Sequence, residues 1–455
     1  MGSTRLSPAL RTLLGAAFVS YLGSGLTLPF LFIYLHSVRG IPTGITGLLI
    51  SGTAVISLPT GPATGTLIDR FSPRAIAVST MVVGVAATSS LVFVHSAVSA
   101  LVPMLLFGVS MGSWAAWGAL AAVMTTEAER PRVFALNFQL LNLGLGIGAV
   151  IAGSLVHVSH PSSFVTVYLA DAASDLVVIT ALLALPVSAF RSTSSGSSGA
   201  AASDLSSEPP VDLPTELEQD SPGGYREVLA DRRMMRYLIV AIVLGVAGYG
   251  AVSAGAVGYA STFLHVSTRS IAWAFAANTA FIVLFQPIGL RVSARMRRTR
   301  AMQLVALFFG SSWVVLLIAG MWPSTLAASL LVGVAFTIFA AGEVLLSPVA
   351  GPLVNDFATP RLIGRYNALS SFTFSAAEVI SPAIAGPMLG ASLGREYLGL
   401  LVFFCGAAAV GFAWLRRSLT DEQDRAPADR PATAAQVDGS PGEDLPDPVP
   451  IGSSA

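Results

Sequence analysis

Four acidic side chains lie inside long apolar stretches of the sequence, where charged groups are rare. They are Asp171, Asp175, Glu343 and Glu378. Burial disfavours the charged form of a carboxyl group, so such a group can bind and release protons near neutral pH. No Arg lies clearly within the same stretches to neutralise them, and an ionisable residue at such a depth is a functional candidate by default. The chemistry expected here is proton or cation binding.

The two aspartates are one helical turn apart and therefore share one face of a helix. One interpretation is a buried polar pair satisfied by Ser, Tyr or backbone groups, and we favour it for Asp175. The other is participation in proton binding, and for Asp171 both interpretations stay open.

Polar and aromatic side chains recur in the same apolar stretches. Aromatic rings suit flat or amphipathic organic ligands, and a few polar groups orient them. The candidates for lining a substrate cavity are Tyr21, Ser24, Thr27, Trp114, Trp117, Asn142, Tyr249, Asn278 and Gln286. Helix packing is an equal alternative for the two Trp residues, and an interhelical hydrogen bond is the alternative for Asn278 and Gln286.

Composition indicates the solvent in which these stretches fold. Of the 455 residues, 53% are hydrophobic and 11% are charged, whereas soluble domains have about 25% charged residues. That is too little polar surface to surround a water-soluble core of this size, so a lipid bilayer is expected. Zero net charge gives no sign of nucleic-acid binding.

Several kinds of chemistry are excluded by residue types that are missing or scarce. The single cysteine, Cys405, allows neither a disulfide framework nor a cysteine metal site. All basic residues are Arg, so a nucleotide-binding loop that needs Lys is excluded. No Ser, His and Asp constellation suggests a hydrolase. We therefore expect neither an enzyme nor a bound cofactor.

Twelve apolar segments are long enough to cross a bilayer, for which about 20 residues are needed. The expected spans are Leu10–Leu35, Thr43–Ile68, Arg74–His95, Ala97–Thr126, Arg132–Val156, Ser163–Pro186, Tyr237–Phe263, Ser270–Gly289, Arg300–Met321, Leu326–Pro348, Arg365–Leu389 and Tyr397–Leu415. The expected fold class is therefore all-α and integral to the membrane.

The spans divide into two groups of six. Residues 1–190 and 237–417 are each expected to form a six-helix bundle. Residues 191–236, rich in Ser, Gly, Pro and acidic residues, are expected to be a cytoplasmic linker that ends in a short amphipathic helix. Residues 418–455 are polar, acidic and Pro-rich, and are expected to be a disordered cytoplasmic tail.

Arg residues concentrate in the loops on one side of the predicted spans. The positive-inside rule places that side, and with it both termini, in the cytoplasm. We expect a multi-pass protein of the cell (inner or plasma) membrane. The halves also resemble each other, because a shift of 233 residues places Arg132 on Arg365 and Gly153 on Gly386. A repeat-built transporter has this layout, with its site between the halves near the bilayer midplane.

The loop after the second span is the most specific motif. It reads Gly65-Thr-Leu-Ile-Asp69-Arg70-Phe-Ser-Pro-Arg74, which resembles the signature of the major facilitator superfamily. The resemblance implies two six-helix bundles and a latch between them on the cytoplasmic side, with Gly65 allowing close helix approach. The gating residues expected from it are Gly65, Asp69, Arg70 and Arg74, to which we add Arg365.

Two further segments bear on the direction of transport. The fifth span contains Gly144 and then Gly148-Ala149-Val-Ile-Ala152-Gly153, which partly matches the Gly-Pro-x-x-Gly-Gly pattern of antiporters in this superfamily. The tenth span and its exit resemble bacterial drug and antibiotic exporters of the superfamily, because a Gly-Glu pair at Glu343 precedes a Pro and then a Gly-Arg-Tyr at Arg365.

The resemblance also ranks the acidic residues. In this fold the first, fourth, seventh and tenth helices line the cavity, and the fifth, eighth and eleventh are among those that flank it. Glu343 is therefore expected to have the most central place and Glu378 the next. We expect proton coupling to reside in these two residues, with Asp171 as a third candidate.

The function implied by the resemblance is secondary active transport by alternating access. We expect a monomer that exports a small organic compound in exchange for protons. An uptake symporter for a nutrient or metabolite is one alternative, because the fifth-span motif is partial and the fourth span lacks the Arg of many antiporters. A transport-inactive sensor or docking protein is another, because the linker and acidic tail could bind a partner.

Overall fold

The structure is a computed structural model, and it describes residues 6–126, 129–186, 223–358 and 362–424. Within these ranges a few side chains, among them those of Asp69 and Trp114, lie outside the described part. Residues 187–222 of the expected linker and 425–455 of the expected tail lie outside it as well.

The N-terminal half consists of six membrane-crossing segments. They are α1 (Pro8–Thr27), which continues through η1 (Leu28–Phe30), α2 (Leu31–Ile33) and η2 (Tyr34–Val38), then α3 (Thr43–Arg70), α4 (Pro73–Ser90) with η3 (Leu91–Phe93), α5 (Ala97–Ser110) with α6 (Ser113–Met124), α7 (Arg130–Leu155) and α8 (Pro161–Ala184). The fourth expected span is interrupted between α5 and α6, at Met111 and Gly112.

The C-terminal half repeats this plan. It begins with the short α9 (Gly223–Ala230). Its membrane segments are α10 (Arg232–Val246) with α11 (Tyr249–Ala251), η6 (Val252–Ala256) and α12 (Val257–Thr262), then α13 (Thr268–Ala294), α14 (Arg298–Ala319), α15 (Leu326–Leu346) with α16 (Ala350–Phe357), α17 (Ile363–Gly390) and α18 (Gly394–Arg416).

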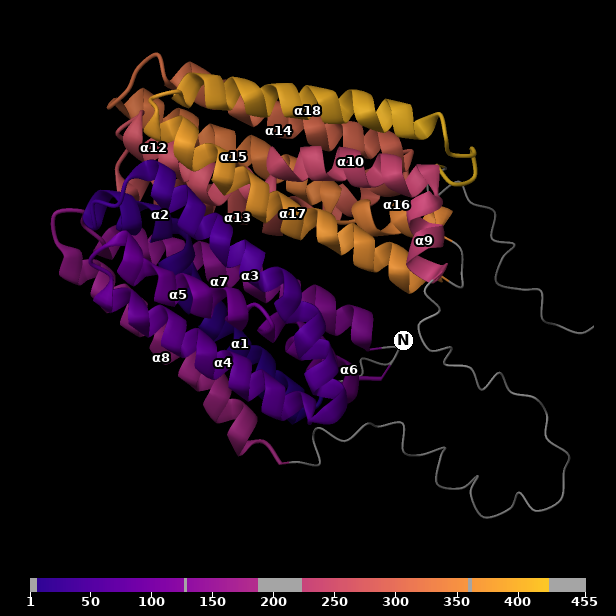
Figure 1. Cartoon of the computed structure of the whole chain (residues 1–455), viewed down its shortest axis with the longest axis horizontal. Helices are drawn as coiled ribbons and strands as arrows, with labels where there is room; N and C mark the ends of the chain where they lie inside the picture. The colour runs from indigo at the N-terminus through magenta and orange to yellow at the C-terminus, as the bar shows by residue number, and fades with distance from the viewer. Residues whose placement is uncertain (1–5, 127–128, 187–222, 359–361, 425–455) are drawn as a thin grey trace, which may run out of the picture.

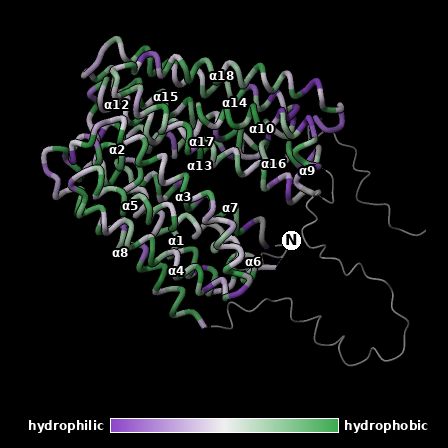
Figure 2. The backbone as a smooth tube through the Cα atoms, in the orientation of Figure 1, coloured by the Kyte–Doolittle hydropathy of each residue, from purple (hydrophilic) through white to green (hydrophobic). Residues whose placement is uncertain are grey.

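Hydropathy and length agree with the twelve expected crossings. Eleven helices of the described ranges are long and apolar enough to span a membrane, and the shorter apolar helix Ala97–Ser110 belongs to the remaining crossing. In Figure 2 hydrophobic residues colour the helices along most of their length, and hydrophilic residues gather near the ends of helices around α9. The fold is an all-α membrane fold of two six-helix bundles.

The two bundles lie side by side and diverge toward one end (Figure 1). We name this end, where α6, α9 and α16 lie, the linker end, and the opposite end, where α2 and α12 lie, the closed end. Between the halves, α3 packs against α17 and α7 against α13. These two helix pairs hold the halves together.

Glycines permit the tightest of these contacts, and they cluster toward the closed end. A Cβ atom on Gly47 of α3 would lie 2.6 Å from the Cα atom of Gly386 on α17, and one on Gly153 of α7 would lie 2.1 Å from the Cβ atom of Ala272 on α13. By contrast, a Cβ atom on Gly65, near the linker end of α3, would meet nothing within 4 Å. The halves diverge at Gly65 in this conformation, so its expected role in close helix approach stays a prediction.

The segment after α18 differs from the expectation of a tail that begins at residue 418. Asp424 is 1% exposed. Its carboxylate accepts hydrogen bonds from the backbone N–H and the hydroxyl of Thr299, at 2.9 and 2.8 Å. Thr299 lies in the first turn of α14, where a carboxylate satisfies open N–H groups and the helix dipole favours negative charge. Residues 418–424 thus belong to the C-terminal bundle.

The short amphipathic helix expected at the end of residues 191–236 is divided at Asp231, which caps the start of α10. Asp231 accepts hydrogen bonds from the backbone N–H of Arg233 at 2.8 Å and from the hydroxyl of Tyr366 on α17 at 2.8 Å. Burial of this carboxyl group acts to raise its pKa, but the bonds from Arg233 and Tyr366 outweigh burial, and the pKa of Asp231 is lowered. Asp231 therefore ties the start of the C-terminal bundle to α17.

Candidate functional site

A cavity of about 540 Å³ lies between the two halves. One wall comes from η1 and α7 of the N-terminal half, and the rest from α11, η6, α13, α15 and α17 of the C-terminal half. The lining residues on α7, α13 and α17 lie near the middle of these long apolar helices. Six of the predicted site residues line this cavity: Asn142, Tyr249, Asn278, Gln286, Glu343 and Glu378.

Glu343 is held in place by hydrogen bonding within the C-terminal half. The side-chain nitrogen of Asn278 donates to Oε2 of Glu343 at 2.7 Å and also to the backbone carbonyl of Phe336 at 3.3 Å. The hydroxyl of Tyr249 faces the same carboxyl group. Asn278 thus lines the cavity and also forms the interhelical hydrogen bond that the sequence left as an alternative.

Glu378 has different surroundings, although it lines the same cavity. It lies near the middle of α17, and its side chain is half-buried. Within the described residues its carboxyl group has no hydrogen-bond or ion-pair partner. The cavity therefore holds one acidic group engaged by the protein and one that is open to a ligand.

Aromatic side chains form much of the remaining surface. They are Phe138, Tyr249, Phe275, Phe336, Phe339 and Phe374. The rings of Phe275 and Phe336 contact each other edge to face, with centroids 5.0 Å apart. No Arg or His is among the residues that line the cavity. Sequence reasoning missed these phenylalanines, although Phe275 lies on the same face of α13 as Asn278 and Ile282, at the spacing of one helical face.

A second cavity, of about 320 Å³, extends from the first toward the linker end. It shares Phe138, Tyr249 and Phe374 with the central cavity. Its other lining residues include Tyr237, near the start of α10, and Ser370, near the start of α17. Both helices begin at the linker end, so the central site is approached from that end.

Asp171 and Asp175 lie elsewhere, inside the N-terminal half where α8 packs against α1. The hydroxyl of Ser20 donates to Oδ1 of Asp175 at 2.6 Å. Asp171 is buried and faces Thr27 of α1. This placement corresponds to the interpretation of Asp175 as a satisfied polar group. It also separates Asp171 and Thr27 from the residues of the central cavity.

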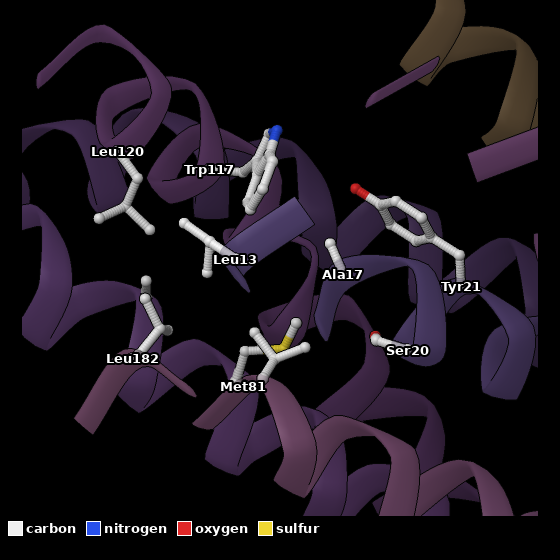
Figure 3. A pocket seen from close by; sticks show the side chains of 10 residues that line it. Leu13, Ala17, Ser20, Tyr21, Met81, Trp117, Leu120 and Leu182 are labelled. Atoms are coloured by element: carbon white, nitrogen blue, oxygen red, sulfur yellow. The ribbon is translucent and has the colours of Figure 1, made fainter. Parts of the chain in front are cut away.

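Tyr21 and Trp117 line a smaller cavity of about 60 Å³ within the N-terminal half (Figure 3). Leu13, Met81 and Leu182 complete much of its wall, so it lies between α1, α4, α6 and α8. The hydroxyl of Tyr21 donates to Asn137 at 2.9 Å. Ser24 is half-buried on α1 and does not line the central cavity. Tyr21 and Trp117 therefore face the inside of the N-terminal bundle, and neither these two residues nor Ser24 and Thr27 line the central cavity as expected.

The expected gating residues lie toward the linker end. Arg70 is exposed at the end of α3. The guanidinium group of Arg74 donates to the backbone carbonyl of Leu183 on α8 at 2.8 Å. The guanidinium carbon of Arg365 lies 5.7 Å from the ring centroid of Tyr225 on α9. The side chains of Asp69 and Trp114 lie outside the described part of the chain.

Comparison with known proteins bears on the fold and the family. The family model described as Major Facilitator Superfamily matches residues 13–263 and 249–442. No curated protein matches the sequence significantly.

Solved transporter structures resemble the whole architecture. The nucleoside transporter NupG superposes with a TM-score of 0.67 at 11% identity, covering 90% of this chain and 99% of that one. A peptide transporter, POT, in complex with alafosfalin gives 0.70 at 16%, covering 91% and 95%. A bacterial homologue of the human lysosomal transporter Spinster, inward-facing and unoccupied, gives 0.70 at 13%, covering 93% and 99%. At such identities the likeness shows the fold alone.

Proposed function

The chain belongs to the major facilitator superfamily, and from this premise we propose that it exports a small organic compound in exchange for protons, by alternating access. It is a multi-pass membrane transporter, not an enzyme. The observation that supports the finer proposal is the central cavity, where two acidic groups lie among aromatic side chains at the middle of the membrane-spanning helices. A site at the interface of two repeated halves near the midplane is where secondary transporters bind their cargo.

Glu343 is the first candidate for the proton. In the charged form its carboxylate accepts the hydrogen bond from Asn278, and protonation would remove the charge from a site with no basic lining residue. A proton and a ligand can exchange across the membrane when binding of one lowers the affinity of the carrier for the other, because each then leaves the site as the other binds. Proton coupling in this proposal resides in Glu343 and Glu378, while Asp171 serves the N-terminal bundle.

The conformation supports access from the linker end. The close contacts at Gly47 and Gly153 seal the closed end, and the second cavity lies on the linker side. Arg70, Arg74, Arg232 and Arg365 lie at the linker end, and a concentration of Arg marks the cytoplasmic side. We therefore assign this structure to an inward-facing state of a cell-membrane protein whose termini are cytoplasmic. Alternation to the outward-facing state would open the α3–α17 and α7–α13 seams.

Proton exchange can be tested in inverted membrane vesicles that contain the full chain. After respiration acidifies their interior, a panel of cationic, neutral and anionic drugs is added, and the internal pH and drug accumulation are followed. An exporter is expected to accumulate at least one compound and to release protons from the vesicle as it does so. The flux through the Glu343→Gln variant is expected to be at least about tenfold lower than through the unmodified protein, because the Gln side chain cannot exchange a proton.

A matched control is Glu396→Gln, which makes the same chemical change on an exposed side chain in the first turn of α18. It should transport like the unmodified protein. Full flux in the Glu343→Gln, Glu378→Gln double variant, present at normal levels, would refute the coupling role. Compound that leaves acidified vesicles together with protons would indicate uptake rather than export.

A further inference from the structure

We propose that the ligand of the central cavity is an organic cation with an apolar body, and that Glu378 binds its positive group while Asn278 holds Glu343. This inference rests on the proposed function in taking the central cavity as the transport site. It goes beyond it by assigning the charge of the cargo and separate roles to the two acidic residues.

The first step is the set of polar atoms that the protein leaves open. The carboxyl group of Glu378 has no partner among the described residues, although it faces the cavity. The side-chain oxygen of Gln286 is buried and also accepts no hydrogen bond in that part of the chain. A buried acceptor without a donor costs about 1–3 kcal/mol. Both groups are therefore arranged for a ligand that supplies donors or positive charge.

The second step is that the side-chain nitrogens of both cavity asparagines face acceptors of the protein. The side-chain nitrogen of Asn278 faces two acceptors, Glu343 and the backbone carbonyl of Phe336. The side-chain nitrogen of Asn142 donates to the backbone carbonyl of Phe138 at 2.9 Å. Because the nitrogen of each amide faces acceptors, the orientation of both amides is set, and each has its oxygen left for a ligand. Both asparagines therefore offer an oxygen acceptor to a ligand, as Glu378 and Gln286 do.

The third step is the electrostatic environment. Aromatic rings surround the acidic groups, and the face of an aromatic ring attracts a cation. No basic residue lines the cavity, so an anionic ligand would meet two acidic groups without any compensating charge. Like charges brought together in a site of low dielectric repel strongly. The same site thus favours a cation and rejects an anion.

The division of roles follows from the partners of the two glutamates. Glu343 is engaged by Asn278 and faces Tyr249, so a ligand that paired with it would have to displace or share these groups. Glu378, which has no such partner, can form an ion pair without breaking a contact. The cavity volume of about 540 Å³ suits a small organic molecule with several rings.

A pair of ions with the same shape and opposite charge provides the test. The full chain is purified in detergent, and binding of radiolabelled tetraphenylphosphonium is measured at equilibrium without any pH gradient. Tetraphenylborate, its anionic counterpart, and neutral triphenylphosphine oxide are used as competitors. The cation is expected to bind saturably, and each competitor is expected to be at least about tenfold weaker, the scale of one lost charge pairing.

Variants of Glu378 test whether this residue binds the positive group of the ligand. Glu378→Gln is expected to weaken binding of the cation about tenfold or more, whereas Glu378→Asp, which keeps the charge, should recover part of the loss. Glu396→Gln is the matched control outside the cavity and should bind like the unmodified protein. Gel filtration of each variant shows whether a loss reflects misfolding, and partial recovery in Glu378→Asp excludes that explanation independently.

Three results would overturn the inference: no saturable binding of tetraphenylphosphonium, equal competition by the borate or the neutral compound, or unchanged binding in Glu378→Gln. Because this measurement uses no gradient, it separates the inference from the proposed function. Selective cation binding without proton-coupled flux would leave the inference standing and reject the export proposal. Proton-coupled flux of neutral compounds without selective cation binding would support the export proposal and reject this inference.

Discussion

At the scale of single residues, three of the four membrane-embedded acidic groups differ clearly in what surrounds them. Asp175 has a hydroxyl partner in Ser20, Glu343 has an amide partner in Asn278, and Glu378 faces the cavity without one. Burying a polar group is costly unless it is hydrogen-bonded. The partnered Asp175 therefore fits a structural role, and the unpartnered Glu378 fits a role in ligand binding.

Ser20→Ala tests the structural role of Asp175. The substitution removes the donor 2.6 Å from Asp175 inside the N-terminal bundle. A buried acceptor left without its partner costs about 1–3 kcal/mol, so the midpoint of thermal unfolding in detergent should fall while coupled flux persists. Ser24→Ala, a neighbouring substitution on α1, is the control. Loss of coupled flux at an unchanged unfolding temperature would instead place Asp175 in the transport mechanism.

At the scale of elements, two carboxylates at helix starts fasten the linker end of the C-terminal bundle. Asp424 binds the first turn of α14, and Asp231 caps α10 and binds Tyr366 of α17. Both positions favour negative charge, because the open N–H groups and the dipole of a helix lie at its start. These contacts are local to one bundle, so we expect their loss to affect stability more than transport.

Asp424→Ala should destabilise the C-terminal bundle by about 1–2 kcal/mol, because two hydrogen bonds to Thr299 are lost at a buried helix start. Thermal unfolding of the purified protein measures the change. The matched control is Asp421→Ala, whose exposed ion pair with Arg297 should contribute at most about 1 kcal/mol. Equal effects of the two substitutions would contradict the role assigned to Asp424.

The lowered pKa of Asp231 predicts that the stability of the folded protein depends on pH. Its pKa is lowered in the folded protein, so its contribution is present above the ordinary Asp value of about 3.9 and is lost as the pH falls through the lower folded value. Asp231→Asn should therefore be less stable than the unmodified protein at pH 7, and the difference should shrink as the pH falls below about 3.9. Unfolding midpoints of the two proteins across pH measure this. A difference that stays constant down to pH values well below this range would show that the charge of Asp231 is not responsible.

At the scale of the whole molecule, the two halves are joined by seams that must separate if access alternates. The seam between α3 and α17 depends on glycine, since a Cβ atom at Gly47 would meet the backbone of Gly386 and Pro382. Closely packed interfaces of this kind have discrete arrangements rather than continuous deformation. The seam therefore sets the balance between the two conformations.

Gly47→Leu should shift this balance toward separation at the closed end. Spin labels on cysteines introduced at Gly40 and Ser392, in the loops next to α3 and α17, report the separation after Cys405 is replaced by Ser. Longer distances are expected than in the unmodified protein. Gly52→Leu, on the same helix, is the matched control, because a Cβ atom there meets nothing within 4 Å, and it should leave the distances unchanged. Identical distances in Gly47→Leu would reject the seam as a determinant of the conformation.

The sequence by itself determined the solvent of the chain, its membrane crossings and the residues worth testing. Hydropathy identifies crossings because the bilayer requires about 20 apolar residues in each. Rare acidic residues in apolar stretches are conspicuous because their burial is costly. The motif from Gly65 to Arg74 pointed to the superfamily that the family model confirms.

Only the tertiary structure decided which of these residues share a site. Tyr21 and Tyr249 are both aromatic residues on membrane-spanning segments, yet the first faces the inside of a bundle and the second faces the cavity between bundles. The rotation of each helix about its axis settles this, and it depends on contacts such as Gly47 with Gly386 that join residues far apart in the sequence. For the same reason, only the packed structure separated the satisfied Asp175 from the open Glu378.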